Sequence, residues 1–235
     1  MLQIAADAGT TDIVAAPHAE NADTYTNDQV QRVFQEFADR ARGLINLHFG
    51  CDFHLTFENV ADAIKNPGKY TLNKQRYLMV ELPGTVVFHA TREALRQLLA
   101  ARITPVIAHP ERNTDLQSNL DELKGWVQDG CLLQLTGYSF LGHFGSAAKR
   151  TADRLMKSGL VHFVASDAHD KVRRSPDLIP AFKYVTNRFG QERARALFDA
   201  NPAAALRGDP LPPSKPRPSY SILFLSHVVE RSPIS

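Results

Sequence analysis

The sequence has no apolar stretch as long as the ~18 residues that a membrane-spanning helix requires, so we expect no membrane insertion. It has only two cysteines, Cys51 and Cys131, too few for a disulfide framework, which suits a reducing compartment and a cytoplasmic location. The formal net charge of +2 gives no electrostatic basis for a nucleic-acid partner. The overall composition is typical of a globular protein, and a chain of 235 residues is long enough to bury a sizeable core.

Apolar runs and amphipathic runs alternate along the chain. Runs typical of buried strands occupy residues 12–16, 45–55, 77–83, 104–110, 131–137 and 161–167. Runs with helical spacing occupy residues 26–44, 59–66, 90–102, 118–130, 146–159, 175–190 and 191–202. This alternation predicts an α/β fold built from βαβ units around a mostly parallel sheet.

The C-terminal segment differs from the rest in composition. Proline and serine are frequent in residues 211–235, and a segment of this kind is typically extended or disordered. We therefore expect a folded domain over residues 1–210 and a disordered tail over residues 211–235.

Imidazole and carboxylate groups gather where the apolar runs end. In barrels of parallel strands, the carboxyl ends of the strands meet at the face that carries the active site. Carboxylates crowded there would repel one another unless a cation lay between them. Mixed imidazole and carboxylate ligands suit Zn, Mn or Fe, and adjacent metal ions serve displacement at phosphorus. The pattern therefore predicts a multi-metal site, with candidate groups at the ends of the runs on His18, Asp52, Glu81, His109, Glu111, Asp167 and His169.

Two arginines stand near these positions and are candidates for anion binding. The guanidinium groups of Arg112 and Arg174 can match phosphate oxygens in a bidentate manner. Among the other histidines, His54 is a weaker candidate for the site, two residues beyond Asp52. His48 and His162 fall inside apolar runs, and we expect them to be structural.

Six segments of the first 210 residues carry a resemblance to a known family: "AAPH" (15–18), "GCDFH" (50–54), "YLMVELP" (77–83), "PVIAHPER" (105–112), "SFLGHFG" (139–145) and "ASDAHD" (165–170). In order and spacing they resemble the PHP (polymerase and histidinol phosphatase) superfamily. Within it, the chain is similar to the bacterial protein-tyrosine phosphatases of capsule and exopolysaccharide loci, the CpsB/YwqE type.

The resemblance implies a distorted (β/α)₇ barrel with two or three divalent metal ions, most often Mn²⁺, at its mouth. It implies that Arg112 and Arg174 contact phosphate, and that His169 or a neighbouring carboxylate handles the proton of the leaving group. The implied substrate is phosphotyrosine on a bacterial tyrosine kinase that regulates polysaccharide export. The implied metal ligands are His18, Asp52, Glu81, His109, Asp167 and His169.

The chain departs from the family pattern in one respect. The family opens with a strand that ends in a D-x-H-x-H motif, which is absent from this sequence. The expectation is therefore a barrel shortened at its N-terminus by about one strand. Two alternatives stay open: a PHP phosphatase with another substrate, such as histidinol phosphate, and a catalytically impaired remnant that lacks two metal-binding histidines.

Overall fold

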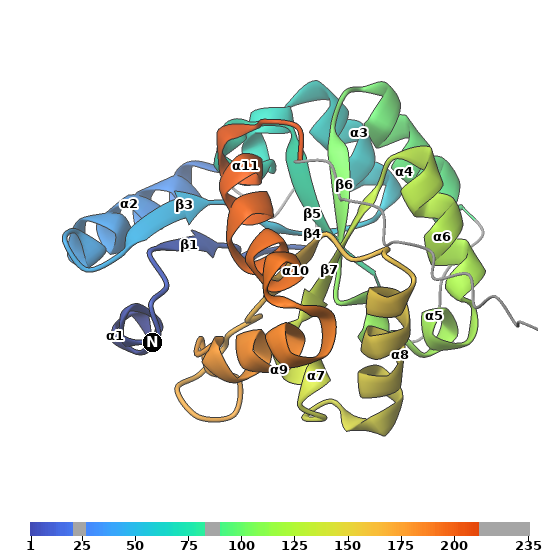
Figure 1. Cartoon of the computed structure of the whole chain (residues 1–235). Helices are drawn as coiled ribbons and strands as arrows, with labels where there is room; N and C mark the ends of the chain where they lie inside the picture. The colour runs from blue at the N-terminus through green and yellow to red at the C-terminus, as the bar shows by residue number, and fades with distance from the viewer. Residues whose placement is uncertain (21–26, 83–89, 212–235) are drawn as a thin grey trace, which may run out of the picture.

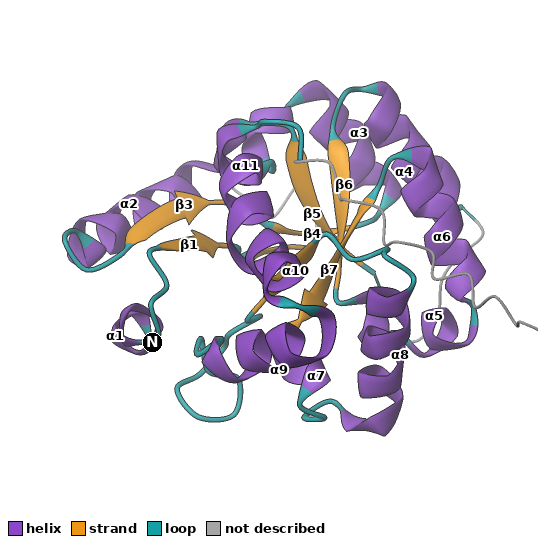
Figure 2. Cartoon of the chain, in the orientation of Figure 1, coloured by secondary structure: helices purple, strands orange, loops and turns teal. Residues whose placement is uncertain are grey.

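The computed structural model describes residues 1–20, 27–82 and 90–211 (Figure 1). In this part of the chain, helices surround a central set of strands, as the colouring of Figure 2 makes plain. None of the helices in these ranges is long and apolar enough to cross a membrane. The predicted disordered tail lies outside the described residues, apart from Leu211.

The strands form two parallel sheets. The main sheet has the strand order β2-β4-β5-β6-β7-β8, and a smaller sheet pairs β1 with β3. The strands of the main sheet are β2 (His18–Ala19), β4 (Asp52–His54), β5 (Tyr77–Glu81), β6 (Thr104–Ala108), β7 (Leu132–Thr136) and β8 (Phe163–Ala165). The smaller sheet contains β1 (Asp12–Ala15) and β3 (Asn46–Phe49).

This arrangement confirms the predicted α/β class, because every strand pair is parallel. Within the described ranges no ladder joins β8 to β2, so the main sheet is open between these two strands.

Helices connect the successive strands on the outside of the sheet. The longer ones are α2 (Asn27–Ala41), α3 (Phe57–Lys65), α4 (Thr91–Ala100), α6 (Leu120–Asp129), α8 (Gly145–Lys157) and α9 (Ile179–Phe189). A π-helical turn, Ala196–Ala200, joins α10 (Gln191–Arg195) to α11 (Asn201–Arg207). The short helices are α1 (Leu2–Asp7), α5 (Thr114–Ser118) and α7 (Gly137–Phe140), and 3₁₀ turns lie at Pro67–Lys69, Leu72–Lys74 and Pro110–Arg112.

The predicted helices are present, but several of them begin or end at other residues than the sequence pattern predicts. The helix expected from residue 175 begins at Ile179, because Pro180 is tolerated only in a first helical turn. The last helical run continues to Arg207. Helices α5 and α7 were not predicted, since one helical turn is too short to show a periodic pattern.

The second expected strand, residues 45–55, is divided into β3 and β4, and the first, residues 12–16, is followed by a short strand that was not expected, β2. Pro17 separates β1 from β2 because it has no N–H group for the ladder. Pairing continues across the break, where Gly50 N donates to Ala15 O at 3.1 Å and Asp52 N donates to Pro17 O at 2.9 Å. Gly50 fits this kink because a Cβ atom there would lie 2.6 Å from Val14 Cγ1.

A main core and two smaller buried clusters, one of which we call the satellite core, hold the domain together. Strand β6 is buried at all of its positions, as expected of a parallel strand covered on both faces. Trp126 of α6 and Phe53 of β4 are fully buried in the main core. The satellite core consists of Ala5, Ala41 and Ile45, and it joins α1 and α2 to the β1–β3 sheet.

His162 has a structural position, as expected from the sequence. It immediately precedes β8, and its Nδ1 accepts a hydrogen bond from Leu133 N at 3.1 Å. Asn201 donates to the His162 carbonyl oxygen at 2.7 Å. Burial, with a smaller contribution from the charge of Arg193, lowers the pKa of His162 to about 4.

This depressed pKa predicts acid lability. The pKa of an unfolded histidine is about 6.5, so between pH 6.5 and 4 the unfolded chain binds a proton that the folded chain does not. The stabilisation is complete above pH 6.5 and is lost as the pH falls toward 4. We expect this group to lower the free energy of unfolding by on the order of 2 kcal/mol between pH 7 and 4.5. Urea unfolding of wild type and His162→Gln at several pH values measures this change. If the free energy of unfolding depended on pH equally in the two proteins, the prediction would be wrong.

Candidate active site

Strand register brings the predicted metal-binding groups to one edge of the main sheet. His18 on β2 lies opposite Asp52 on β4, and His54 on β4 lies opposite Glu81 on β5. His109 follows β6 directly. Glu81 ends β5, and the short parallel strands β2 and β4 bring His18, Asp52 and His54 to this same end of the sheet.

Glu81 is the centre of this group. Its Oε2 lies 3.4 Å from His18 Nδ1 and 3.2 Å from His54 Nε2, and its Oε1 lies 3.2 Å from His109 Nε2. Asp52 Oδ2 lies 3.6 Å from His18 Nδ1. Two sets of three residues place their ligand atoms within 4.8 Å of one another: His18, His54 and Glu81, and Asp52, Glu81 and His109.

The electrostatics of the two carboxylates fit a cation site. Burial and the neighbouring Glu81 charge raise the pKa of Asp52. The hydrogen bond and charge of His109 keep the pKa of Glu81 low, against the effect of burial. Asp52 Oδ1 is buried and has no hydrogen-bond partner among the described residues. A buried oxygen of this kind, beside a second carboxylate and several imidazoles, suits a divalent metal ion.

The two predicted anion-binding arginines lie together beside this group. Arg112 Nη1 and Arg174 Nη2 both donate to Asp167 Oδ2. The Arg112 guanidinium stands 4.3 Å from the centre of the Phe144 ring, and that of Arg174 stands 6.0 Å from it. Stacking on an aromatic face holds a guanidinium plane in a fixed orientation. Two oriented guanidinium groups that converge on one carboxylate oxygen can also bind a phosphate group.

Asp167 and His169 occupy a different part of the site from the other predicted ligands. The Asp167 carboxylate pairs with the two arginines, and neither residue belongs to the two three-residue sets. His169 Nδ1 lies 3.1 Å from the Asp167 carbonyl oxygen and 3.8 Å from its Oδ1. The His169 side chain is about half exposed, at 46%. The structure therefore brings His18, Asp52, Glu81 and His109 together and places Asp167 and His169 with the arginines.

Two site residues have a backbone conformation that is rare outside glycine. His109 has φ 34° and Asp167 has φ 50°, both in the left-handed region. Such conformations cost on the order of 1–3 kcal/mol each and concentrate at functional sites. In both cases the turn comes within two residues of a strand end and redirects the chain at the mouth of the sheet.

Glu111 stabilises the turn that carries Arg112 through buried hydrogen bonds. It is fully buried, and its Oε1 accepts hydrogen bonds from Thr136 N at 2.9 Å and Ser139 Oγ at 2.6 Å. Burial raises its pKa, and these two donors offset part of that effect. Glu111 therefore ties the turn that carries Arg112 to the start of α7, the helix before the loop with Phe144.

Truncating Glu111 should destabilise the protein. In Glu111→Ala the buried Thr136 N–H loses its acceptor, which costs about 1–3 kcal/mol. Glu111→Gln keeps a carbonyl oxygen of the same reach and should lose much less. Thermal or urea unfolding of both variants at neutral pH measures the difference. Equal losses in the two variants would show that the hydrogen bonds at Oε1 are unimportant.

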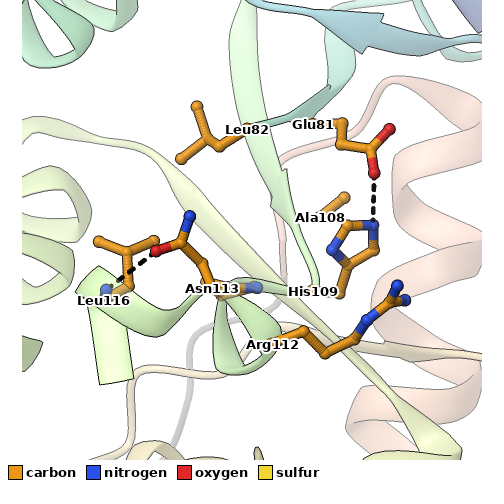
Figure 3. A pocket seen from close by; sticks show the side chains of 8 residues that line it. Glu81, Leu82, Ala108, His109, Arg112, Asn113 and Leu116 are labelled. Carbon is orange, nitrogen blue, oxygen red and sulfur yellow. Dashed lines mark hydrogen bonds and ion pairs between the residues drawn. The ribbon is translucent and has the colours of Figure 1, made fainter. Parts of the chain in front are cut away.

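A small pocket of about 120 Å³ opens beside the cluster (Figure 3). Glu81, His109 and Arg112 line one part of it, and the apolar side chains of Leu82 and Leu116 line another. Other lining residues include Asn113, whose side-chain oxygen accepts a hydrogen bond from Leu116 N at 3.0 Å. The pocket thus has a charged wall and an apolar wall.

Three residues of this site are only weakly indicated by the sequence pattern. His54 is a weak candidate by position, although its spacing of two from Asp52 in an extended strand puts both side chains on one face. The supporting role of Glu111 and the contact of Phe144 could not be predicted, because a buried acid and a loop aromatic show their partners only in the folded chain.

Comparison with known proteins agrees with this geometry. A family model described as "Capsular polysaccharide synthesis, CpsB/CapC" matches residues 1–207. The chain is 34% identical over 180 residues to the putative tyrosine-protein phosphatase CapC of Staphylococcus aureus, covering 74% of this chain and 69% of that protein. It is 31% identical over 225 residues to the tyrosine-protein phosphatase YwqE of Bacillus subtilis, covering 93% and 87%.

A solved structure is also similar. It is described as "Crystal structures of YwqE from Bacillus subtilis and CpsB from Streptococcus pneumoniae, unique metal-dependent tyrosine phosphatases". The TM-score is 0.82 at 28% identity, covering 90% of this chain and 86% of that one, which confirms the predicted fold. The chain therefore belongs to the CpsB/CapC family of capsular polysaccharide synthesis.

Proposed function

We propose that this chain is a metal-dependent protein-tyrosine phosphatase of capsule or exopolysaccharide synthesis. The observation that carries the proposal is the convergence of His18, Asp52, Glu81 and His109 at one sheet edge, next to two oriented arginines. Family membership and the metal-dependent phosphatase relatives support the same reaction class.

We propose that the site binds two or three divalent ions and that these are Mn²⁺; the two sets of three ligand atoms support a site for more than one ion. Imidazole nitrogens and carboxylate oxygens are ligands that Mn²⁺, Fe²⁺ and Zn²⁺ share. When bound, such ions lower the pKa of water and polarise phosphoryl oxygens. We keep the full predicted ligand set as part of the proposal: His18, Asp52, Glu81, His109, Asp167 and His169.

In this proposal the protein's own groups bind and orient the phosphate. Arg112 and Arg174 hold its oxygens and stabilise the charge that develops on them. Asp167 pairs with both guanidinium groups, which keeps the two groups directed at one point. In this proposal His169, which is half exposed beside them, or a neighbouring carboxylate gives a proton to the leaving tyrosyl oxygen.

A cysteine nucleophile does not fit this chain. Cys51 and Cys131 are both buried, and neither belongs to a C-x₅-R loop. Burial, with a smaller contribution from Asp52, raises the pKa of Cys51. Burial raises that of Cys131 to about 12, so both thiols stay protonated. Their reduced state suits the cytoplasmic location that we propose.

The two-walled pocket supports an aryl phosphate as substrate. With phosphate at the charged wall, an aromatic ring attached to it can contact Leu82 and Leu116. The protein partner in this proposal is a phosphorylated bacterial tyrosine kinase of polysaccharide export.

Turnover of three substrates tests the proposal. The purified chain is given Mn²⁺ and a phosphotyrosyl peptide, the matching phosphoseryl peptide, or histidinol phosphate. We expect the phosphotyrosyl peptide to have the highest kcat/KM, with activity lost in excess EDTA and retained by the Cys51→Ala, Cys131→Ala double variant. Full activity in EDTA, or preference for histidinol phosphate, would overturn the proposal.

A further inference from the structure

One imidazole at the centre of the site lies outside the predicted ligand set. His54 stands at the end of β4, and its Nε2 is 3.2 Å from Glu81 Oε2. The His18 Nδ1 is 3.4 Å from the same oxygen. The two imidazole rings meet edge to face, with their centres 5.7 Å apart. Two ring nitrogens from neighbouring strands therefore converge on one carboxylate oxygen.

The two oxygens of Glu81 face different partners. Oε2 faces His18 and His54, whereas Oε1 faces His109. His109 also belongs to the three-residue set with Asp52, and His54 does not. The donors thus separate into two groups that share only the Glu81 carboxylate, and each group has three ligand atoms.

We propose that His54 is a metal ligand, and that His18, His54 and Glu81 Oε2 form one cation position. The inference rests on the proposed metal dependence. It adds His54 as a ligand, and a metal-dependent site built from the predicted ligand set does not require this residue. Two imidazoles and one carboxylate are a common donor set for a first-row divalent ion with open coordination positions. The side chains of His18 and His54 are 49% and 36% exposed, which leaves room for water or a phosphate oxygen at the same ion.

Asn59 gives this position a rigid support. It is fully buried at the start of α3, and its Nδ2 donates to the carbonyl oxygens of Ala19 at 3.0 Å, Glu20 at 3.2 Å and His54 at 2.8 Å. The amide therefore joins the end of β2 to the end of β4. It sets the separation of the two strands that present His18 and His54, and such support outside the ligand shell raises metal affinity.

Metal content tests the inference independently of activity. Wild type, His54→Gln and His48→Gln are loaded with Mn²⁺, dialysed, and analysed for ions per chain; titration calorimetry then gives the affinities. His48→Gln is the matched control, because His48 is an imidazole on β3 that contacts Asp12 at 2.7 Å, outside the site. We expect His54→Gln to lose one equivalent, or to bind it about 10- to 100-fold more weakly. His48→Gln should bind as wild type does.

The outcomes separate the inference from the proposed function. If wild type binds Mn²⁺ and His54→Gln binds as many ions with the same affinity, His54 is not a ligand, and the proposed phosphatase stands. If wild type binds no Mn²⁺, both proposals are overturned. A second measurement uses Co²⁺ as the probe: the visible absorption of the bound ion should change in His54→Gln and not in His48→Gln. Unchanged Co²⁺ spectra in both variants would also overturn the inference.

Discussion

Glu81→Gln should abolish phosphatase activity, with a fall in kcat of about a thousandfold, as for loss of a principal electrostatic group. Glutamine has nearly the same shape, so the substitution tests the charge of residue 81 and not its volume. That charge is the one feature common to both groups of ligands, since Glu81 lies within 3.4 Å of His18, His54 and His109. Without it, neither group keeps three ligands of the original chemistry.

Metal analysis and kinetics together check this expectation. The Glu81→Gln chain should bind less Mn²⁺ than wild type while its far-UV circular dichroism stays the same. Glu58→Gln is a suitable control, because Glu58 is an exposed acid in the first turn of α3. If Glu81→Gln kept more than a tenth of the wild-type kcat with full metal content, the central role of this carboxylate would be wrong.

Arg112→Lys is expected to lower kcat/KM for a phosphotyrosyl peptide by about 10²- to 10³-fold. Lysine keeps the positive charge but has no planar fork, so it cannot make the bidentate contact with phosphate oxygens. It also loses the stacking of the guanidinium on Phe144 at 4.3 Å, which orients the fork. A large loss despite an unchanged charge would show that geometry, and not charge alone, determines phosphate binding.

The comparison for this variant is Arg154→Lys, on the exposed surface of α8. Its kcat/KM for the phosphotyrosyl peptide should equal that of wild type. Inorganic phosphate, tested as a competitive inhibitor, should bind more weakly to Arg112→Lys by a similar factor. Equal inhibition constants for wild type and Arg112→Lys would indicate that Arg112 acts elsewhere than on the phosphate.

The sequence pattern was sufficient to predict that the side chains of four residues lie together: His18, Asp52, Glu81 and His109. Each stands where an apolar run ends, and parallel strands bring such ends to one edge. The pattern could not give the partners of Asp167, because its contacts with Arg112 and Arg174 depend on a loop of irregular backbone. Nor could it indicate the left-handed conformations of His109 and Asp167, which only the surrounding tertiary structure stabilises.

The satellite core of Ala5, Ala41 and Ile45 has a consequence for the dynamics of the enzyme. The β1–β3 sheet that it supports shares no ladder with the main sheet in the described ranges. A unit with few buried apolar contacts opens more often than the body of a domain, so its amide hydrogens should exchange with deuterium first. Strands β2 and β4 follow directly from this unit, so each opening would loosen the attachment of His18 and Asp52. Occupancy of the site by ions would then slow deuterium uptake in residues 12–15 and 46–49, far from the ions themselves.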